Sequence, residues 1–338
     1  MSAPKVVILT VTYGSRWKFL SRVVSYAMGE EYVTKLIIVD NGSLDQEEMF
    51  SGIKPHSDKI DVLRFEKNVG SARGFARGIE YAQKIDADFL FILDDDNIPE
   101  EGAIQKFLEL RNLFSHEKVV LCGHRVDLPG TEKYFHEPAI RDTSPHGTFF
   151  QVFGFRKIIN FFRLLIGKEK QNKDLGPFMP VVPIESFAYG GSFIPMEAIR
   201  KAPLPDESLV LYGDDNEYSW GINQLGYDLY LCSRPVIHDI DLTFNEGSHL
   251  FGFFSPETKP FKVYFHIRNS VRLSRKHSHQ WKPFLLVNVI LWNMGLCMLG
   301  LAKYGPTRHY FSRVKLIFQA VYGGYIKNVT IPDEAKLP

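Results

Sequence analysis

Apolar runs of strand length alternate with helical patterns through the first third of the chain. The runs are rich in β-branched side chains, which is typical of strands buried on both faces of a sheet. Strands are predicted over 5–12, 35–40, 61–65, 88–93 and 119–123, and helices over 17–28 and 71–85. This alternation predicts an α/β domain with a mostly parallel sheet flanked by helices.

Polar side chains end three of the predicted strands. The carboxyl ends of the strands in an open parallel sheet line the crevice in which ligands bind, so these side chains are expected to meet there. They are Thr12 and Tyr13 after the first strand, Asp40 after the second, and Asp94, Asp95 and Asp96 after the fourth. The three strand ends therefore predict a binding site at one edge of the sheet.

The triplet Asp94, Asp95 and Asp96 concentrates negative charge at the end of a buried strand. Adjacent like charges repel, and unpaired buried carboxylates cost several kcal/mol. Mg²⁺ or Mn²⁺ bound to phosphate oxygens would neutralise them, because both ions prefer hard oxygen ligands. The alternative is an acidic turn in which an Asp caps a helix.

Two further segments near these strand ends suit a nucleotide. Asp40 begins an Asp-Asn-Gly-Ser turn, and its carboxylate could accept a hydrogen bond from a base N–H; ordinary turn chemistry is the alternative. The loop from Asn68 opens the predicted helix over 71–85, and helix N–H groups with Arg73 suit a diphosphate. Gly74 and Gly78 alternatively serve close helix packing.

A second acidic cluster follows in the middle of the chain. Asp214, Asp215 and Glu217 end an apolar stretch and begin a helical pattern, where the helix dipole stabilises carboxylates. One carboxylate facing the crevice could take a proton from a hydroxyl; the alternative is that all three are ordinary helix-start residues. Upstream, Gly190 and Gly191 allow close backbone approach to a ligand, or only a tight turn.

Together these motifs resemble glycosyltransferase family 2. They are the Val-Thr-Tyr strand end, Val-Asp-Asn-Gly-Ser around Asp40, Asn68-Val-Gly70 with Arg73-Gly74, and Leu-Asp-Asp-Asp ending at Asp96. The resemblance implies a Rossmann-like GT-A fold, a nucleotide-sugar donor, inversion and a divalent metal, Mn²⁺ or Mg²⁺. It implies that Asp40 contacts the base and that the triplet meets ribose and metal. The nucleotide-sugar-binding residues would be Thr12, Tyr13, Asp40, Asn68, Arg73, Asp94, Asp95 and Arg268.

The second half resembles the galactofuranosyltransferase and rhamnosyltransferase branch of that family. Its Trp-Asp-Asp-x-Glu motif is matched here by Asp214-Asp215-x-Glu217, with Gly213 in place of Trp. The resemblance implies that Asp215 is the base and that Asp214 and Glu217 orient it or hold acceptor hydroxyls. It also implies that Gly190 and Gly191 line the donor-sugar and acceptor site.

The resemblance also assigns the metal ligands and Arg268. Asp94 and Asp96 would bind the metal, and His238 would complete the site with a neutral imidazole; the alternative for His238 is a simple hydrogen-bonding role. Arg268 lies in a segment that resembles Tyr-Tyr-x-x-Arg-Asn and would approach the donor phosphate or the acceptor. The alternative for Arg268 is a basic helix face.

The last third of the chain combines apolar and basic residues. Segment 284–302 is apolar except for Asn288 and Asn293, and basic residues flank it on both sides. It only just reaches spanning length, which favours a helix in the membrane plane or packed in a groove over a true span or a soluble bundle. Segment 149–173 is interpreted as an interfacial helix or as an amphipathic helix packed on the domain.

Composition and charge limit which other classes of protein fit this sequence. A net charge of +1 gives no global field for nucleic acid. The isolated Cys122, Cys232 and Cys297 argue against a disulfide framework or a zinc site and suit a reducing cytoplasm. The N-terminus enters a strand-like run without the pattern of a signal peptide.

The sequence thus predicts a GT-A domain over 1–250, with a nucleotide-binding part over 1–123 and an acceptor part over 124–250. A basic and apolar helical region over 251–338 would associate with the cytoplasmic face of a bacterial inner membrane. We expect a metal-dependent inverting hexosyltransferase that uses UDP-galactofuranose or dTDP-rhamnose and a lipid-linked glycan acceptor such as an O-antigen precursor. We also expect that it can form a homo-oligomer. A sugar nucleotidyltransferase and a non-catalytic, metal-dependent glycan-binding protein are the alternatives.

Overall fold

The computed structural model describes residues 3–128, 131–136, 177–241, 250–277, 282–326 and 329–337. Segment 149–173, for which the sequence predicts a helix, lies outside the described residues. The chain divides into two compact units. The sheet unit comprises Met1–Thr143, Pro177–Val210 and Asp214–Leu242, and the helical unit comprises Ser144–Gly176, Leu211–Gly213 and Thr243–Pro338.

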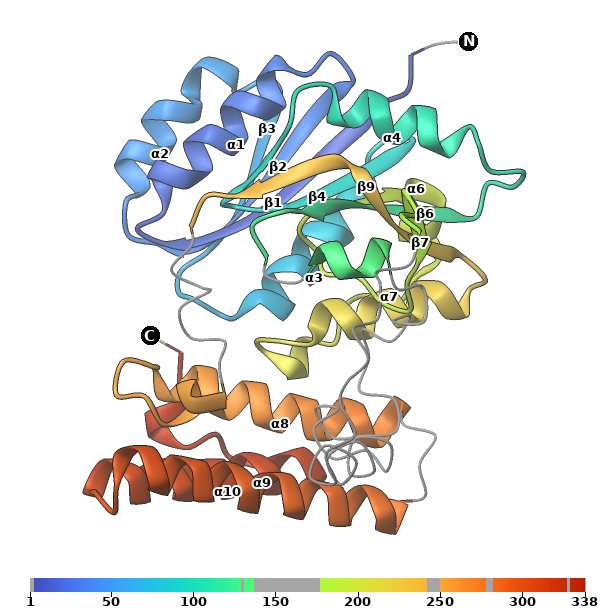
Figure 1. The fold of residues 1–338 in the computed structure, drawn as a ribbon. Helices are drawn as coiled ribbons and strands as arrows, with labels where there is room; N and C mark the ends of the chain where they lie inside the picture. The colour runs from blue at the N-terminus through green and yellow to red at the C-terminus, as the bar shows by residue number, and fades with distance from the viewer. Residues whose placement is uncertain are drawn as a thin grey trace. The chain divides into compact units, whose positions relative to one another are not determined.

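A mixed, mostly parallel sheet forms the centre of the sheet unit, as the alternating pattern predicts (Figure 1). Its strand order is β3-β2-β1-β4-β8-β6-β9-β5, with β7 paired to β9. The strands are β1 (Val6–Gly14), β2 (Val33–Ser43), β3 (Ile60–Phe65), β4 (Phe89–Asp94), β5 (Asn97–Pro99), β6 (Val119–Arg125), β7 (Val181–Pro183), β8 (Ser192–Pro195) and β9 (Asp228–Asp239). Strands β1 to β4 pair in parallel, and β8 joins β4 to β6 in antiparallel fashion.

Helices cover both faces of this sheet because alternate strand residues are apolar on each face (Figure 1). On one face Val6, Ile8 and their neighbours pack against α1, α2 and α4; on the other, Val7 and Leu9 pack against α3, α6 and α7. The helices are α1 (Trp17–Gly29), α2 (Gln46–Ile53), α3 (Ser71–Ala82), α4 (Ala103–Arg111), α6 (Met196–Lys201) and α7 (Asp214–Gln224). Short 3-10 helices occupy Lys54–His56, Thr131–Phe135 and Glu207–Leu209.

Helix α3 lies unusually close to the sheet. A Cβ atom on Gly78 would come within 2.4 Å of Leu9 Cδ1, and one on Gly74 would come within 2.8 Å of Val11 Cγ1. Both glycines therefore serve close packing of α3 on β1. That packing brings the amino end of α3 beside the carboxyl end of β1, where the binding site is predicted.

The helical unit consists mainly of three helices. They are α8 (Pro260–His277), α9 (Lys282–Tyr304) and α10 (Arg308–Tyr325), with 3-10 helices at Leu250–Phe254 and Asp333–Ala335. Helix α9 is long and apolar enough to cross a membrane by length and composition alone, which is weak grounds for a span. It contains the predicted apolar segment 284–302.

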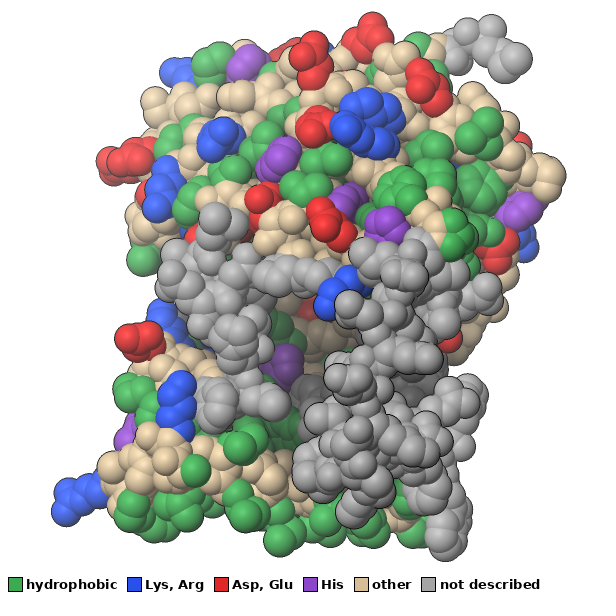
Figure 2. Space-filling view, viewed as in Figure 1, with side chains coloured by type: hydrophobic (Ala, Val, Ile, Leu, Met, Phe, Trp, Pro, Cys, Tyr) green, Lys and Arg blue, Asp and Glu red, His purple; other side chains and the backbone are tan. Residues whose placement is uncertain are grey.

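The two asparagines of α9 lie on the face that packs against the protein. Asn288 and Asn293 are 3% exposed and share a buried stripe with Val289, Trp292 and Leu296. The opposite face is exposed and apolar, and the same holds for part of α10 (Figure 2). The exposed apolar side chains are Phe284, Leu286, Val287, Ile290, Leu291, Met294, Met298, Leu299 and Leu301 on α9, and Phe311, Phe318 and Tyr322 on α10.

Candidate active site

The acid triplet lies where β4 ends, and Arg16 pairs with two of its members. Arg16 stands just before α1, and its Nε donates to both carboxylate oxygens of Asp95, at 2.9 and 2.8 Å. Its Nη2 donates to Asp96 at 3.1 Å, and its Nη1 donates to Asp241 at 2.6 Å. One guanidinium group thus binds three carboxylates that come from two distant parts of the chain.

Arg125, the last residue of β6, pairs with the remaining member of the triplet. Its Nη1 lies 3.1 Å from Asp94 Oδ2, and its guanidinium group also binds Asp239. Asn97 supports this network, because its Nδ2 donates to Asp239 Oδ1 at 2.8 Å and its Oδ1 accepts from the Asp94 backbone N–H at 3.1 Å. The triplet is therefore held by two arginines.

Sequence reasoning missed both arginines and their second acidic partners. One feature of the sequence could have indicated Arg16, because it lies only two residues after the strand end Tyr13-Gly14. Arg125, Asp239 and Asp241 had none, because their partners lie far away in the chain and only the folded sheet brings them together.

Negative charge exceeds positive charge at this strand end among the described residues. The carboxylates of Asp94, Asp95, Asp96, Asp239 and Asp241 pair with the two guanidinium groups of Arg16 and Arg125. Burial, reinforced by repulsion from Asp94 and Asp95, raises the pKa of Asp96 to about 7. Burial also raises the pKa of Asp94 and of Asp95. The site is thus poised to accept a further positive charge.

The residues present fit a divalent cation by donor chemistry. Asp94 and Asp96 offer hard carboxylate oxygens, and their side chains are 35% and 14% exposed, whereas Asp95 is closed off by Arg16 and Thr12. Within the described ranges no three His, Cys, Asp or Glu side chains are arranged to hold a metal ion by themselves. Two carboxylates are sufficient when substrate phosphates supply other ligands, as is usual for Mg²⁺.

Thr12 and Tyr13 play different parts at the end of β1. The Thr12 hydroxyl is buried and donates to Asp95 Oδ2 at 2.7 Å, so it holds the triplet in place. Tyr13 is 46% exposed, and the Arg16 guanidinium group lies 5.5 Å from its ring centroid. Of the two, Tyr13 offers an accessible surface to a ligand.

One carboxylate oxygen of Asp40 stabilises a turn, and the other lacks a hydrogen-bond donor among the described residues. Its Oδ1 accepts the Ser43 backbone N–H at 2.7 Å, as an Asp-Asn-Gly-Ser turn requires. Its Oδ2 is buried and has no hydrogen-bond partner among the described residues, although Arg64 Nε lies 3.6 Å away. A buried carboxylate oxygen without a donor fits the predicted hydrogen bond from a base N–H.

The loop before α3 is braced by two asparagines. Asn68 Oδ1 accepts from Asn41 Nδ2 at 3.1 Å and from the Gly70 N–H at 3.0 Å, so Asn68 shapes the loop. Gly70 has φ +92°, and a Cβ atom there would come within 2.1 Å of the Val210 carbonyl oxygen. Arg73 is half exposed on α3, and its Nε lies 3.4 Å from Glu207 Oε2. A diphosphate, which carries more negative charge than one carboxylate, could bind Arg73 in place of Glu207.

Gly190 leaves space beside the triplet. A Cβ atom at this position would come within 2.2 Å of Asn97 Oδ1, 2.6 Å of Asp94 Oδ2 and 2.9 Å of Arg125 Nη1. Gly191 adopts φ +89°, which favours glycine, and its N–H donates to the Ile92 carbonyl at 2.9 Å. Gly190 therefore lies beside the triplet, whereas Gly191 lies beside Ile237 and Gly123. The contact of both glycines with donor sugar and acceptor stays a prediction.

Replacing Gly190 with Ala is expected to lower transferase activity about tenfold or more, with little change in melting temperature. The added methyl group meets the ends of side chains, which can move, so the protein folds but Asp94 and Arg125 are displaced. Gly221→Ala in α7 is the matched control, because its Cβ would meet only Pro203, at 3.6 Å. Full activity in Gly190→Ala would show that Asp94 need not hold this position.

The second acidic cluster begins α7 in the same unit. Asp214 is 3% exposed and accepts from the Ser71 hydroxyl at 3.2 Å, whereas Asp215 is half-buried and accepts from the Asn216 backbone N–H at 2.8 Å. Burial, with repulsion from Asp215, raises the pKa of Asp214 to about 8. Burial, with repulsion from Asp94, raises the pKa of Asp215 to about 6. Asp94 is thus close enough to both residues to affect their ionisation.

The two carboxyl groups of this pair are buried and repel each other, so the pair resists losing both protons at neutral pH. Asp215 is the more accessible of the two, so it is the member that a ligand can reach. Glu217 lies half-buried one turn into α7. The arrangement favours Asp215 as the proton acceptor, and this role stays a prediction.

His238 does not contact the triplet. Its Nδ1 lies 3.3 Å from Asp127 Oδ2, and its Nε2 lies 3.8 Å from Glu100. Successive strand residues point to opposite faces, and the next residue of β9, Asp239, is the one that binds Arg125. The role of His238 as a third metal ligand stays a prediction that this geometry does not support.

Arg268 belongs to the helical unit. It is 8% exposed on α8, its Nε donates to Asn269 Oδ1 at 2.8 Å, and its guanidinium group lies 4.8 Å from the Phe265 ring centroid. Asn269 in turn donates to the backbone carbonyls of Leu211 and Tyr212, at 2.7 and 2.8 Å. The contact of Arg268 with donor or acceptor stays a prediction.

Comparison with solved structures finds chains of similar fold. The crystal structure of S. aureus TarS 1-349 has a TM-score of 0.51 and 11% identity, with 95% of this chain and 80% of that chain covered. The same protein in complex with UDP-GlcNAc has a TM-score of 0.50 and 12% identity, with 94% and 81% covered. GalNAc-T7 with UDP, GalNAc and Mn²⁺ has a TM-score of 0.51 and 16% identity, with 80% and 51% covered.

At these identities the likeness shows the fold alone, and the chain spans about half the length of the GalNAc-T7 chain. Comparison with curated protein sequences gave no match. Among family models, the one described as glycosyl transferase family 2 matches residues 7–172. That match includes the ends of β1, β2 and β4, where the acid triplet and Asp40 lie. The chain therefore contains a glycosyltransferase family 2 domain with the GT-A fold.

Proposed function

We propose that the protein is a metal-dependent inverting glycosyltransferase that moves a sugar from a nucleotide diphosphate onto a saccharide hydroxyl. The observation that carries this proposal is the placement of the two acidic clusters in one unit. Ser71, which begins α3 beside the strand ends, donates to Asp214 at the start of α7 at 3.2 Å, and Asp94 at the end of β4 is close enough to raise the pKa of Asp215. This placement supports a donor held at the strand ends and a base on α7 that act on one substrate.

The residues of the chain would divide the reaction as follows. Asp40 would accept a hydrogen bond from the base, and Asp215 would take the proton from the acceptor hydroxyl as its oxygen attacks the anomeric carbon. Asp214, which accepts a hydrogen bond from the Ser71 hydroxyl, would orient Asp215 or hold an acceptor hydroxyl together with Glu217. Asp94 and Asp96 would hold a divalent cation, which when bound stabilises negative charge on the leaving diphosphate.

The donor is proposed to be UDP-galactofuranose or dTDP-rhamnose. A carboxylate at Asp40 suits the ring N–H that both uracil and thymine offer. The ligands of the similar structures, UDP-GlcNAc for TarS and UDP, GalNAc and Mn²⁺ for GalNAc-T7, support a uridine diphosphate donor and a divalent metal.

The acceptor is proposed to be a lipid-linked saccharide of a bacterial surface polysaccharide, such as an O-antigen precursor. The exposed apolar face of α9 supports attachment to the cytoplasmic surface of the inner membrane. The sequence from 258 to 332 contains lysines and arginines but neither Asp nor Glu, which suits an anionic surface.

A donor panel tests the function directly. The purified protein is incubated with UDP- and dTDP-sugars in the presence of Mn²⁺, Mg²⁺ or a chelator, and the nucleotide product is identified. Release of UDP or dTDP that requires metal is expected. Release of pyrophosphate would instead indicate a nucleotidyltransferase, and tight sugar binding without any turnover would indicate a glycan-binding protein.

A further inference from the structure

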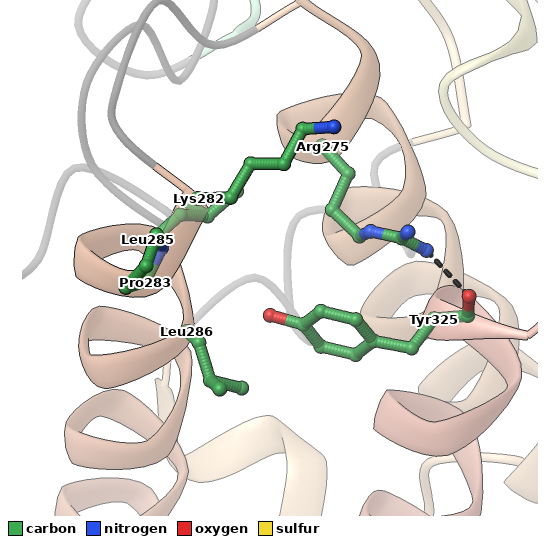
Figure 3. Close-up of a pocket in the computed structure, with 6 residues that line it drawn as sticks. All are labelled: Arg275, Lys282, Pro283, Leu285, Leu286 and Tyr325. Carbon is green, nitrogen blue, oxygen red and sulfur yellow. Dashed lines mark hydrogen bonds between the residues drawn. The ribbon is translucent and has the colours of Figure 1, made fainter.

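A cavity of about 320 Å³ lies within the helical unit, where the end of α8, the start of α9 and the end of α10 meet (Figure 3). Its lining combines two cations, one tyrosine and three apolar residues. Arg275 and Lys282 supply positive charge, and Tyr325 supplies an aromatic ring with a hydroxyl group. The apolar lining consists of Pro283, Leu285 and Leu286.

The cations of this cavity have donors to spare. Arg275 uses Nη1 to reach the carbonyls of Gly324 and Tyr325, at 3.2 and 2.5 Å, and its guanidinium group lies 4.7 Å from the Tyr325 ring centroid. The backbone contacts fix the side chain without neutralising its charge. Lys282 is exposed, forms no ion pair with any described residue, and reaches across the cavity toward α8 (Figure 3).

The Tyr325 hydroxyl is an unused polar group in the same wall. It is buried and has no hydrogen-bond partner among the described residues, and it points toward the first turn of α9 (Figure 3). A buried hydroxyl without a partner is costly, so such groups usually serve a ligand or water. Here it would add a neutral donor to two cationic ones.

The three helices that form the cavity carry no negative charge of their own. Helices α8, α9 and α10 contain no Asp or Glu, so no carboxylate on these elements competes for Arg275 or Lys282. Leu286, which lines the cavity, also begins the exposed apolar face of α9 that continues through Ile290 and Met294. An anionic group and a hydrocarbon chain would therefore find adjoining surfaces.

We propose that this cavity binds the phosphate headgroup of an anionic membrane lipid, whose hydrocarbon chains lie along the exposed face of α9. Arg275, Lys282 and the Tyr325 hydroxyl hold the phosphate oxygens, and charge-assisted hydrogen bonds give the contact its strength. The proposal deepens the membrane location proposed above but requires no transferase activity. The two can therefore fail separately.

Flotation with vesicles tests the cavity. The full-length protein is mixed with vesicles of phosphatidylcholine alone or of phosphatidylcholine with phosphatidylglycerol, and selective binding to the second is expected. The double variant Arg275→Gln/Lys282→Gln should weaken this binding about tenfold or more, because it removes both charged donors to the lipid phosphate. Lys54→Gln/Lys59→Gln, which removes the same charge from the sheet unit, should bind as the wild type does.

Two further variants distinguish a specific phosphate site from general electrostatic attraction of the protein to anionic vesicles. Tyr325→Phe keeps the net charge and removes only an unpartnered hydroxyl, so it should fold normally and lose anionic-lipid selectivity several-fold. Lys303→Gln/Lys315→Gln removes two cations of the same unit outside the cavity and should have the smaller effect. An equal loss in that variant, equal binding to both vesicle types, or self-association in place of vesicle binding would overturn the proposal.

Discussion

Replacing Asp215 with Asn is expected to lower sugar transfer by about 10²–10⁴-fold while donor affinity stays within twofold of wild type. An amide has the size of the carboxylate but cannot take the acceptor proton. Asp215 lies at the start of α7, and its Oδ1 accepts hydrogen bonds from the backbone N–H and the Nδ2 of Asn216. The amide oxygen of an asparagine can accept the same two bonds, so the substitution leaves the helix start intact. Single-turnover transfer and calorimetric donor titration measure the two quantities separately.

Asp214→Asn provides the matched comparison. Burial and repulsion from Asp215 raise the pKa of Asp214 and so favour its neutral form, which an amide imitates. We expect less than a tenfold loss of transfer. Asp228→Asn, at an exposed position of β9, controls for a general effect of losing one carboxylate. Near wild-type transfer by Asp215→Asn together with an inactive Asp214→Asn would reverse the assignment.

The pH profile of transfer should report the same group. Because the pKa of Asp215 is about 6 and its ionised form is the base, the rate should fall as pH decreases through about 6. Asp214 holds its proton over that range, so Asp214→Asn should leave this limb in place. If the rate of transfer by the wild type did not fall between pH 7 and pH 5, the role of Asp215 as the base would be contradicted.

The sheet and the position of the site could be predicted because both depend on local pattern. A continuous apolar run specifies a strand buried on both faces, and a polar residue after it marks the strand end, as at Thr12, Asp40 and Asp94. Parallel strands then bring those ends together without further information. The three-residue strand β5 escaped prediction because its hydrogen bonds to β9, rather than its own sequence, make it a strand.

The electrostatics of the triplet could not be predicted, because the partners are distant in the chain. We expected a cation to neutralise the acids, and the structure has Arg16 and Arg125 there. The exposed face of α9 could not be predicted either. Asn288 and Asn293 counted against a true span, and the structure places both on the buried stripe; only packing reveals which face is apolar and exposed.

Asp96→Asn is expected to abolish the metal-dependent part of donor binding. Asp96 is the more buried of the two candidate metal ligands, and an amide oxygen without charge binds Mg²⁺ or Mn²⁺ far more weakly than a carboxylate. Calorimetry of UDP or dTDP binding with Mn²⁺ and with a chelator measures this difference. An unchanged gain in affinity on adding Mn²⁺ would exclude Asp96 as a ligand.

The same variant should make the metal-free protein more stable, which separates loss of function from loss of fold. The pKa of Asp96 is raised from 3.8 to about 7, so the folded state binds this proton more tightly than the unfolded chain, and ionised Asp96 lowers stability as pH rises from about 4 to about 7. At pH 8 the amide should raise the free energy of unfolding by on the order of 2–4 kcal/mol, whereas at pH 4 the two proteins should be alike. Arg16 keeps Asp95 and Asp241 as partners in the variant. Urea unfolding in a chelator at both pH values measures the effect, and a variant less stable than wild type at pH 8 would show that Arg16 and Asp96 form a net stabilising pair.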